Sequence, residues 1–180
     1  MKLRDKIYFE EPVRDRFYNG FSEDETVVLK YDGKTGIFTM RNFFTLVKPA
    51  ERLVAKEEDI WLKDISEDME VLGRNGFERV LQVIRRKVYE PILVVKTKTH
   101  KTVVSASHEI PVSKENGEEL VRADNLKEGD KIYVADENGE NGRYEEIEKI
   151  EKDKKWRLSV YGMLTESGGA FISGIFQKSY

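Results

Sequence analysis

The sequence has no cysteine, and only two of its 180 residues are histidines, His100 and His108. Without cysteine the chain can form no disulfide, hold no metal through thiolates and offer no thiol nucleophile. A Ser-His-Asp triad would have to use one of the two histidines. The glycine-rich loops of common nucleotide-binding folds are also missing. We therefore expect neither a cofactor nor a metal site.

The sequence has little excess of either sign of charge: it has 31 Lys and Arg residues and 34 Asp and Glu residues, for a net charge of -3. The two signs are interleaved along the chain, which makes nucleic acid or an anionic membrane an unlikely partner. No apolar run approaches the roughly 18 residues that span a bilayer. Residues 1–16 lack the apolar stretch of a signal peptide. The expected location is the cytoplasm, or an assembly formed there.

Proline is scarce, with four residues, and one of them, Pro12, interrupts any helix near the start of the chain. Residues 1–19 contain too few apolar side chains for a core of their own. We interpret them as an N-terminal arm that packs on the domain or reaches a partner. Residues 20–180 have the length of one ordinary domain.

The apolar residues of the domain predict short β-strands more than helices. About ten strands alternate with turn signals such as Asp32-Gly33 and Asn116-Gly117. One short helix is expected over residues 41–56, where Phe43, Phe44 and Val47 share a face. The predicted fold class is therefore mostly β, built from hairpins.

The segment 92–134 carries a resemblance to the central part of the Hint family, which includes inteins and hedgehog autoprocessing domains. In that family a strand pair leads into a T-x-x-H motif, where this sequence has Ser105-Ala106-Ser107-His108. A Leu-x-x-Gly-Asp turn follows, here at residues 126–130. Residues 19–29 are similar to the opening block of a Hint domain, and residues 160–179 are similar to its closing blocks. The resemblance implies a curled β-hairpin domain.

The resemblance also implies what splicing chemistry would require. A hydroxyl or thiol at the first position attacks the preceding carbonyl, and a histidine with a Thr or Ser polarises the scissile amide. Ser105 and His108 match the second requirement. The first position falls on Gly20 or Phe21, neither of which is a nucleophile, and Ser22 serves only if the loop is short.

The remaining splicing positions depart from the family pattern. Gly162 stands where the block after Val160-Tyr161 has an aspartate, and Lys178-Ser179 replaces the terminal His-Asn. Cyclisation would therefore have no side-chain amide. For His108 the alternative is a buried core histidine.

These departures favour a non-catalytic, Hint-derived structural or interaction module with a protein partner, part of a larger assembly such as a virion. The alternative is an autoprocessing domain that cleaves itself or splices, either natural with an atypical Ser22 or engineered to be inactive. Its candidate catalytic residues are Ser22, Ser105 and His108.

Overall fold

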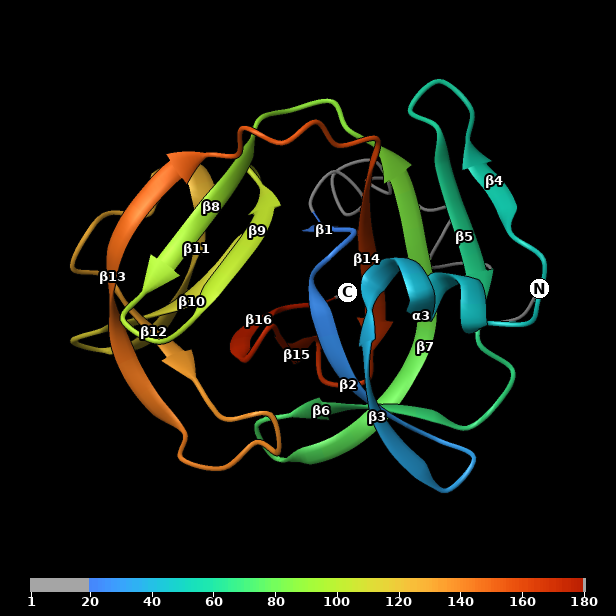
Figure 1. The fold of residues 1–180 in the computed structure, drawn as a ribbon, viewed down its shortest axis with the longest axis horizontal. Coiled ribbons are helices and arrows are strands. Elements are labelled where there is room, and N and C mark those ends of the chain that lie inside the picture. The colour runs from blue at the N-terminus through green and yellow to red at the C-terminus, as the bar shows by residue number, and fades with distance from the viewer. Residues whose placement is uncertain (1–19, 180) are drawn as a thin grey trace.

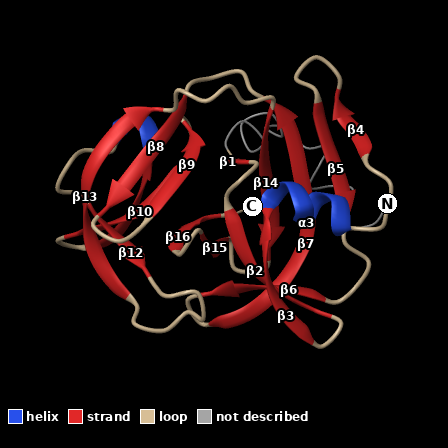
Figure 2. Ribbon diagram, viewed as in Figure 1, coloured by secondary structure: helices blue, strands red, loops and turns tan. Residues whose placement is uncertain are grey.

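The computed structural model describes residues 20–179. The predicted N-terminal arm, residues 1–19, lies outside the described residues, as does the last residue of the chain. Within the described part, β-strands dominate, with one α-helix, α3, and one short 3-10 turn among them (Figure 2). The predicted mostly β fold class is therefore confirmed.

The first half of the domain runs from the opening strand to a strand of 12 residues, β7. Its elements are β1 (Phe21–Ser22), β2 (Thr26–Tyr31), β3 (Lys34–Thr39), α3 (Met40–Leu46), β4 (Arg52–Ala55), β5 (Ile60–Asp64), β6 (Met69–Gly73) and β7 (Gly76–Lys87).

The second half begins with the strand pair that leads into the Ser-x-x-His motif. Its elements are β8 (Ile92–Thr97), β9 (Lys101–Ser105), β10 (Glu109–Lys114), β11 (Gly117–Arg122), the 3-10 turn η1 (Ala123–Asn125), β12 (Lys131–Val134), β13 (Arg143–Lys152), β14 (Ser159–Thr165), β15 (Gly169–Ile172) and β16 (Ile175–Lys178).

The strands join in one hydrogen-bonded path that curls on itself (Figure 1). Its order is β11-β10-β12-β13-β8-β9-β1-β14-β7-β6-β2-β3, with β4, β5, β15 and β16 attached to the side. The short strand β1 lies between β9 and β14, so it joins segments that are far apart in the sequence. This position makes the start of the domain the junction between its two halves.

The predicted helix over residues 41–56 is correct only in its first half. The helix begins after Thr39, whose side chain accepts a hydrogen bond from the Asn42 amide, and it ends at Leu46. Pro49 follows within three residues and cannot continue a helix. Residues 52–55 instead form β4, which pairs with β5. Pairing with β5 supplies the hydrogen-bond partners of the backbone groups there.

The expected number of strands was too low, since the described residues form sixteen. Residues 170–176 form a hairpin of two strands, β15 and β16, which turns at Ser173 and Gly174 with positive φ. Strand β14 begins only at Ser159, and Trp156 is 79% exposed in the loop before it. Apolar composition alone did not distinguish a strand from a turn in these places.

The main core is formed by apolar side chains from both halves of the domain. Phe43 and Phe44 of α3 are buried, as predicted for its apolar face, together with Val47 just after it. They pack in the same cluster as side chains of β2, β9, β12 and β14, including Leu29, Val104 and others. The core thus fixes β1 and the strands around it, which carry the candidate site.

Candidate functional site

The first described residue, Gly20, is held by Ser105 through two hydrogen bonds. The Gly20 amide donates to the Ser105 hydroxyl oxygen at 2.9 Å, and the Ser105 amide donates to the Gly20 carbonyl at 3.0 Å. Ser105 is the last residue of β9, and both residues are buried. The structure therefore places the Ser105 hydroxyl, the first residue of the Ser-x-x-His motif, on the amide of the peptide bond that precedes Gly20.

Gly20 has no room for a side chain. A Cβ atom added there would lie 2.5 Å from the backbone oxygen of Tyr161 and 3.2 Å from its carbonyl carbon. Both contacts are to backbone in β14, which pairs with β1 and with β7, so the obstacle cannot rotate away. Of the two candidate first positions, Gly20 is therefore sterically closed to a side chain, and Phe21 carries a buried ring that packs against His108.

Ser22 is buried, and its hydroxyl oxygen has no hydrogen-bond partner among the described residues. It pairs with Val160 in β14, whereas Phe21 pairs with Tyr161. Successive side chains of a strand point to opposite faces. Since the Phe21 ring stacks edge-on against His108, with ring centroids 4.7 Å apart, Ser22 points away from the histidine.

His108 is fully buried at the end of the turn that follows β9. Its amide donates to the Ser105 carbonyl at 3.0 Å, and its carbonyl accepts from the Ala123 amide at 2.7 Å. Neither ring nitrogen has a hydrogen-bond partner among residues 20–179. Burial lowers the pKa of His108 to about 3, with the Gln177 side chain opposing that shift and Lys178 adding to it. The imidazole is therefore neutral at physiological pH.

A buried polar network that sequence reasoning missed lies close to this histidine. The Glu25 carboxylate accepts hydrogen bonds from the Thr102 and Ser173 hydroxyl groups, each at 2.7 Å. Gln177 donates to the Thr102 hydroxyl oxygen at 2.8 Å. Burial raises the pKa of Glu25 to about 7, although the hydrogen bonds from both hydroxyl groups oppose this. The network ties β2, β9 and the β15–β16 hairpin together.

No sequence signal distinguished Glu25 from its acidic neighbours. The sequence reads Glu23-Asp24-Glu25, a cluster typical of an exposed face. In the fold, Asp24 pairs on the surface with Lys155 and Arg157, while Glu25 turns inward. The described residues contain no group of three or more His, Cys, Asp or Glu side chains arranged to hold a metal.

The closing blocks place no reactive group at the site. Gly162 faces Ile84 across the β14–β7 pair, and no carboxylate takes its place. Lys178 forms an ion pair with Glu109 at 3.0 Å. The Ser179 hydroxyl lies 2.5 Å from that of Thr165, and the Ser179 amide donates to the Gly168 carbonyl. Neither Lys178 nor Ser179 has a carboxamide, and the carboxamide of Gln177 donates hydrogen bonds to the Thr102 hydroxyl and the Ile172 carbonyl.

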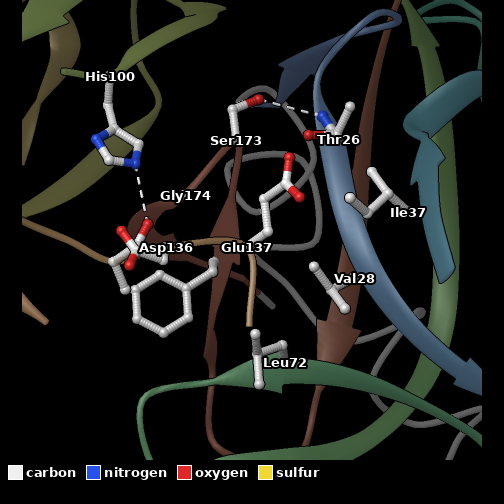
Figure 3. Close-up of a pocket in the computed structure, with 11 residues that line it drawn as sticks. Thr26, Val28, Ile37, Leu72, His100, Asp136, Glu137, Ser173 and Gly174 are labelled. Atoms are coloured by element: carbon white, nitrogen blue, oxygen red, sulfur yellow. Dashed lines mark hydrogen bonds between the residues drawn. The ribbon is translucent and has the colours of Figure 1, made fainter. Parts of the chain in front are cut away.

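A separate cavity of about 230 Å³ opens beside the β2–β3 hairpin (Figure 3). Its lining combines apolar side chains with carboxylates and hydroxyl groups: Thr26, Val28, Ile37, Leu72, His100, Ala135, Asp136, Glu137, Phe171, Ser173 and Gly174. His100 is held at its edge by a hydrogen bond between its Nε2 atom and the Ala135 carbonyl at 2.9 Å. Ser173 contributes to this cavity and to the buried network around Glu25.

The sequence matches no protein-family model and no curated protein. Its fold, however, matches solved intein structures over nearly their whole length. The crystal structure of an intein from a hyperthermophile superimposes with a TM-score of 0.78, over 89% of this chain and 99% of that one, at 16% sequence identity.

Two further structures give the same result. The transcription factor IIB Mvu mini-intein has a TM-score of 0.74 and 19% identity, and covers 90% of this chain and 99% of its own. The PabCDC21-1 intein has a TM-score of 0.75 and 19% identity, over 89% and 98% of the two chains. The chain therefore has the Hint fold, which confirms the resemblance seen in its sequence. No helix of the described part is long and apolar enough to cross a membrane.

Proposed function

We propose that this protein is a Hint-derived domain that does not splice and that acts as an interaction module in a larger assembly. The observation that carries the proposal is the contact between Gly20 and the Tyr161 backbone, where a Cβ atom would approach to 2.5 Å. A nucleophile at this position would need both a side chain and space for it. At Phe21, the other candidate first position, the side chain is a buried ring and not a nucleophile. Neither candidate position therefore supplies the group that splicing requires.

The alternative, autoprocessing through Ser22, is disfavoured because Ser22 and Ser105 are placed at different peptide bonds. An acyl shift by Ser22 attacks the carbonyl of the residue before it, which is Phe21. The Ser105 hydroxyl instead contacts the amide of Gly20, at the bond two residues earlier. Ser105 thus contacts one peptide bond, whereas the Ser22 hydroxyl would attack another.

Support for an interaction role comes from exposed apolar side chains. Trp156 is 79% exposed and Leu158 is 57% exposed in the loop between β13 and β14. Tyr89, 48% exposed, lies nearby, since the Val88 amide donates to the Leu158 carbonyl. Large apolar groups gathered on a surface are typical of contacts with other proteins.

The proposal can be tested by fusing folded tags to both ends of the chain and recording the intact mass over days, with and without hydroxylamine. An unchanged mass is expected, because no ester can form at Gly20. Hydroxylamine also cleaves Asn-Gly bonds through a cyclic imide, and Asn19-Gly20 is one of five such bonds in the chain. Only a cut at residues 20–22 therefore bears on the proposal. The Asn19→Ala variant is therefore required as a control for cleavage that does not involve an ester.

A product cut at residues 20–22 in the Asn19→Ala variant would overturn the proposal. If that product disappeared on His108→Ala substitution, the autoprocessing alternative would be correct instead. Ligation of the two tags would indicate splicing.

A further inference from the structure

The cavity beside the β2–β3 hairpin has an apolar wall that is open to solvent. Ile37 is 50% exposed, and Val28 on the paired strand is partly buried. Leu72 and Phe171 are buried beneath them. An apolar wall of this kind gains free energy when a hydrocarbon chain covers it, by about 25 cal/mol for each Å² removed from water.

The other side of the cavity carries negative charge. Asp136 and Glu137 follow β12 and line the cavity, and both are exposed. Figure 3 shows the Glu137 carboxylate directed toward Thr26 and Ser173. Within residues 20–179, Glu137 has no ion pair or hydrogen bond through its side chain. Asp136 accepts a hydrogen bond from Asn141, and its nearest cation, Arg143, is 4.0 Å away.

The basic side chains near the cavity are engaged by other groups, and within residues 20–179 none of them pairs with Glu137. The Nε2 atom of His100 is occupied by the Ala135 carbonyl, and its Nδ1 atom lies 2.7 Å from the Thr99 hydroxyl. Arg143 forms its shorter ion pair with Glu145, at 2.9 Å. A ligand that enters the cavity therefore meets an apolar surface first and uncompensated negative charge next to it.

We infer that this cavity binds a basic side chain, lysine or arginine, from a protein partner. The aliphatic stem of such a side chain would lie along Val28 and Ile37, and its cation would reach Glu137. Lysine and arginine combine these two properties in one side chain. The inference rests on the interaction role proposed above and specifies the chemistry of the partner.

Other ligand classes fit the cavity less well. An anion would be repelled by the two carboxylates, and a wholly apolar group would leave Glu137 facing it without a counter-ion. The two exposed carboxylates fall short of the six to eight oxygen ligands that a calcium ion takes. The charge of the cavity thus selects for a cation, and its wall selects for an aliphatic stem.

The test is an NMR titration of the full chain with Nα-acetyl-lysine methylamide. The matched probe is Nα-acetyl-norleucine methylamide, which has a similar stem without the charge. We expect the lysine probe to shift amide signals of β2, β3 and residues 135–137, and the norleucine probe to bind more weakly. The Glu137→Gln variant should weaken lysine binding by about threefold to tenfold. The control is Glu140→Gln, an exposed residue of the same loop that does not line the cavity.

Equal binding of the two probes, or equal effects of Glu137→Gln and Glu140→Gln, would overturn the inference. So would shifts that map to another face. Shifts in the free protein that grow with its own concentration would assign the cavity to a second copy of this chain instead. The intact mass of each NMR sample is recorded as well. Failure of the non-splicing proposal appears as a change in that mass, whereas failure of this inference leaves the mass unchanged.

Discussion

Replacement of the buried Glu25 by glutamine should remove a large pH dependence from the stability of the domain. Glu25 is 5% exposed and accepts hydrogen bonds from the Thr102 and Ser173 hydroxyl groups. A glutamine oxygen can accept the same two bonds, and its amide carries no charge at any pH. The substitution thus isolates the cost of ionising a carboxyl group in the core.

The size of the effect follows from the pKa of Glu25, which burial raises from 4.5 to about 7. Below pH 4.5 the carboxyl group is protonated in both the folded and the unfolded chain. Between pH 4.5 and 7 the unfolded chain releases its proton while the folded chain retains it, so the free energy of unfolding falls as the pH rises. The total loss is about 3 kcal/mol, reached above pH 7.

The assay is urea denaturation of the wild type and the Glu25→Gln variant at a series of pH values from 4 to 8.5. The free energy of unfolding of the variant, relative to the wild type, should rise by about 3 kcal/mol across this range. The difference between the two proteins is used because ionisation of His108, whose pKa burial lowers to about 3, affects both equally. Glu128→Gln, at an exposed position, is the matched control and should show no such rise.

A difference between the two proteins that stays constant with pH would refute the reasoning, because Glu25 would then have the same pKa in the folded and unfolded chains. A pH-independent offset added to the expected slope would not refute it. Such an offset reports only how well the glutamine amide fits beside the Val103 backbone, which hydrogen-bonds the Glu25 carboxylate. The diagnostic quantity is the slope with pH.

Two pairs of substitutions test the site itself through the free energy of unfolding, measured by denaturant titration. Gly20→Ala should destabilise the domain by about 1–3 kcal/mol because its Cβ atom meets the Tyr161 backbone, whereas Gly162→Ala, with its nearest contact at 3.9 Å, should cost little. Equal destabilisation by the two substitutions would contradict the conclusion that there is no space for a side chain at Gly20. Ser105→Ala should cost about 1–2 kcal/mol because it leaves the Gly20 amide without a partner, and Ser22→Ala should be neutral or stabilising because its hydroxyl has none. The reverse order would mean that Ser22, rather than Ser105, makes the important contact.

The candidate site was only partly visible in the sequence. The Ser-x-x-His spacing pointed to Ser105 and His108, and the structure places them next to the start of the domain. The sequence left open whether Ser22 lies near His108, because a strand of two residues gives no periodicity to read. The pairing of β1 with both β9 and β14 decided this, by turning Phe21 toward the histidine and Ser22 away.

The mostly β fold class could be predicted from the sequence, because hairpin turns and strand periodicity are local properties that need no knowledge of distant contacts. The departures from the splicing pattern could be read there too, since Gly162 and Ser179 are visible as residue types. Three features needed the folded chain: the lack of space at Gly20, the burial of Glu25, and the position of Glu137 beside an apolar cavity. Each of these depends on backbone or side chains brought together from segments far apart in the chain, and their packing fixes which groups lose contact with water.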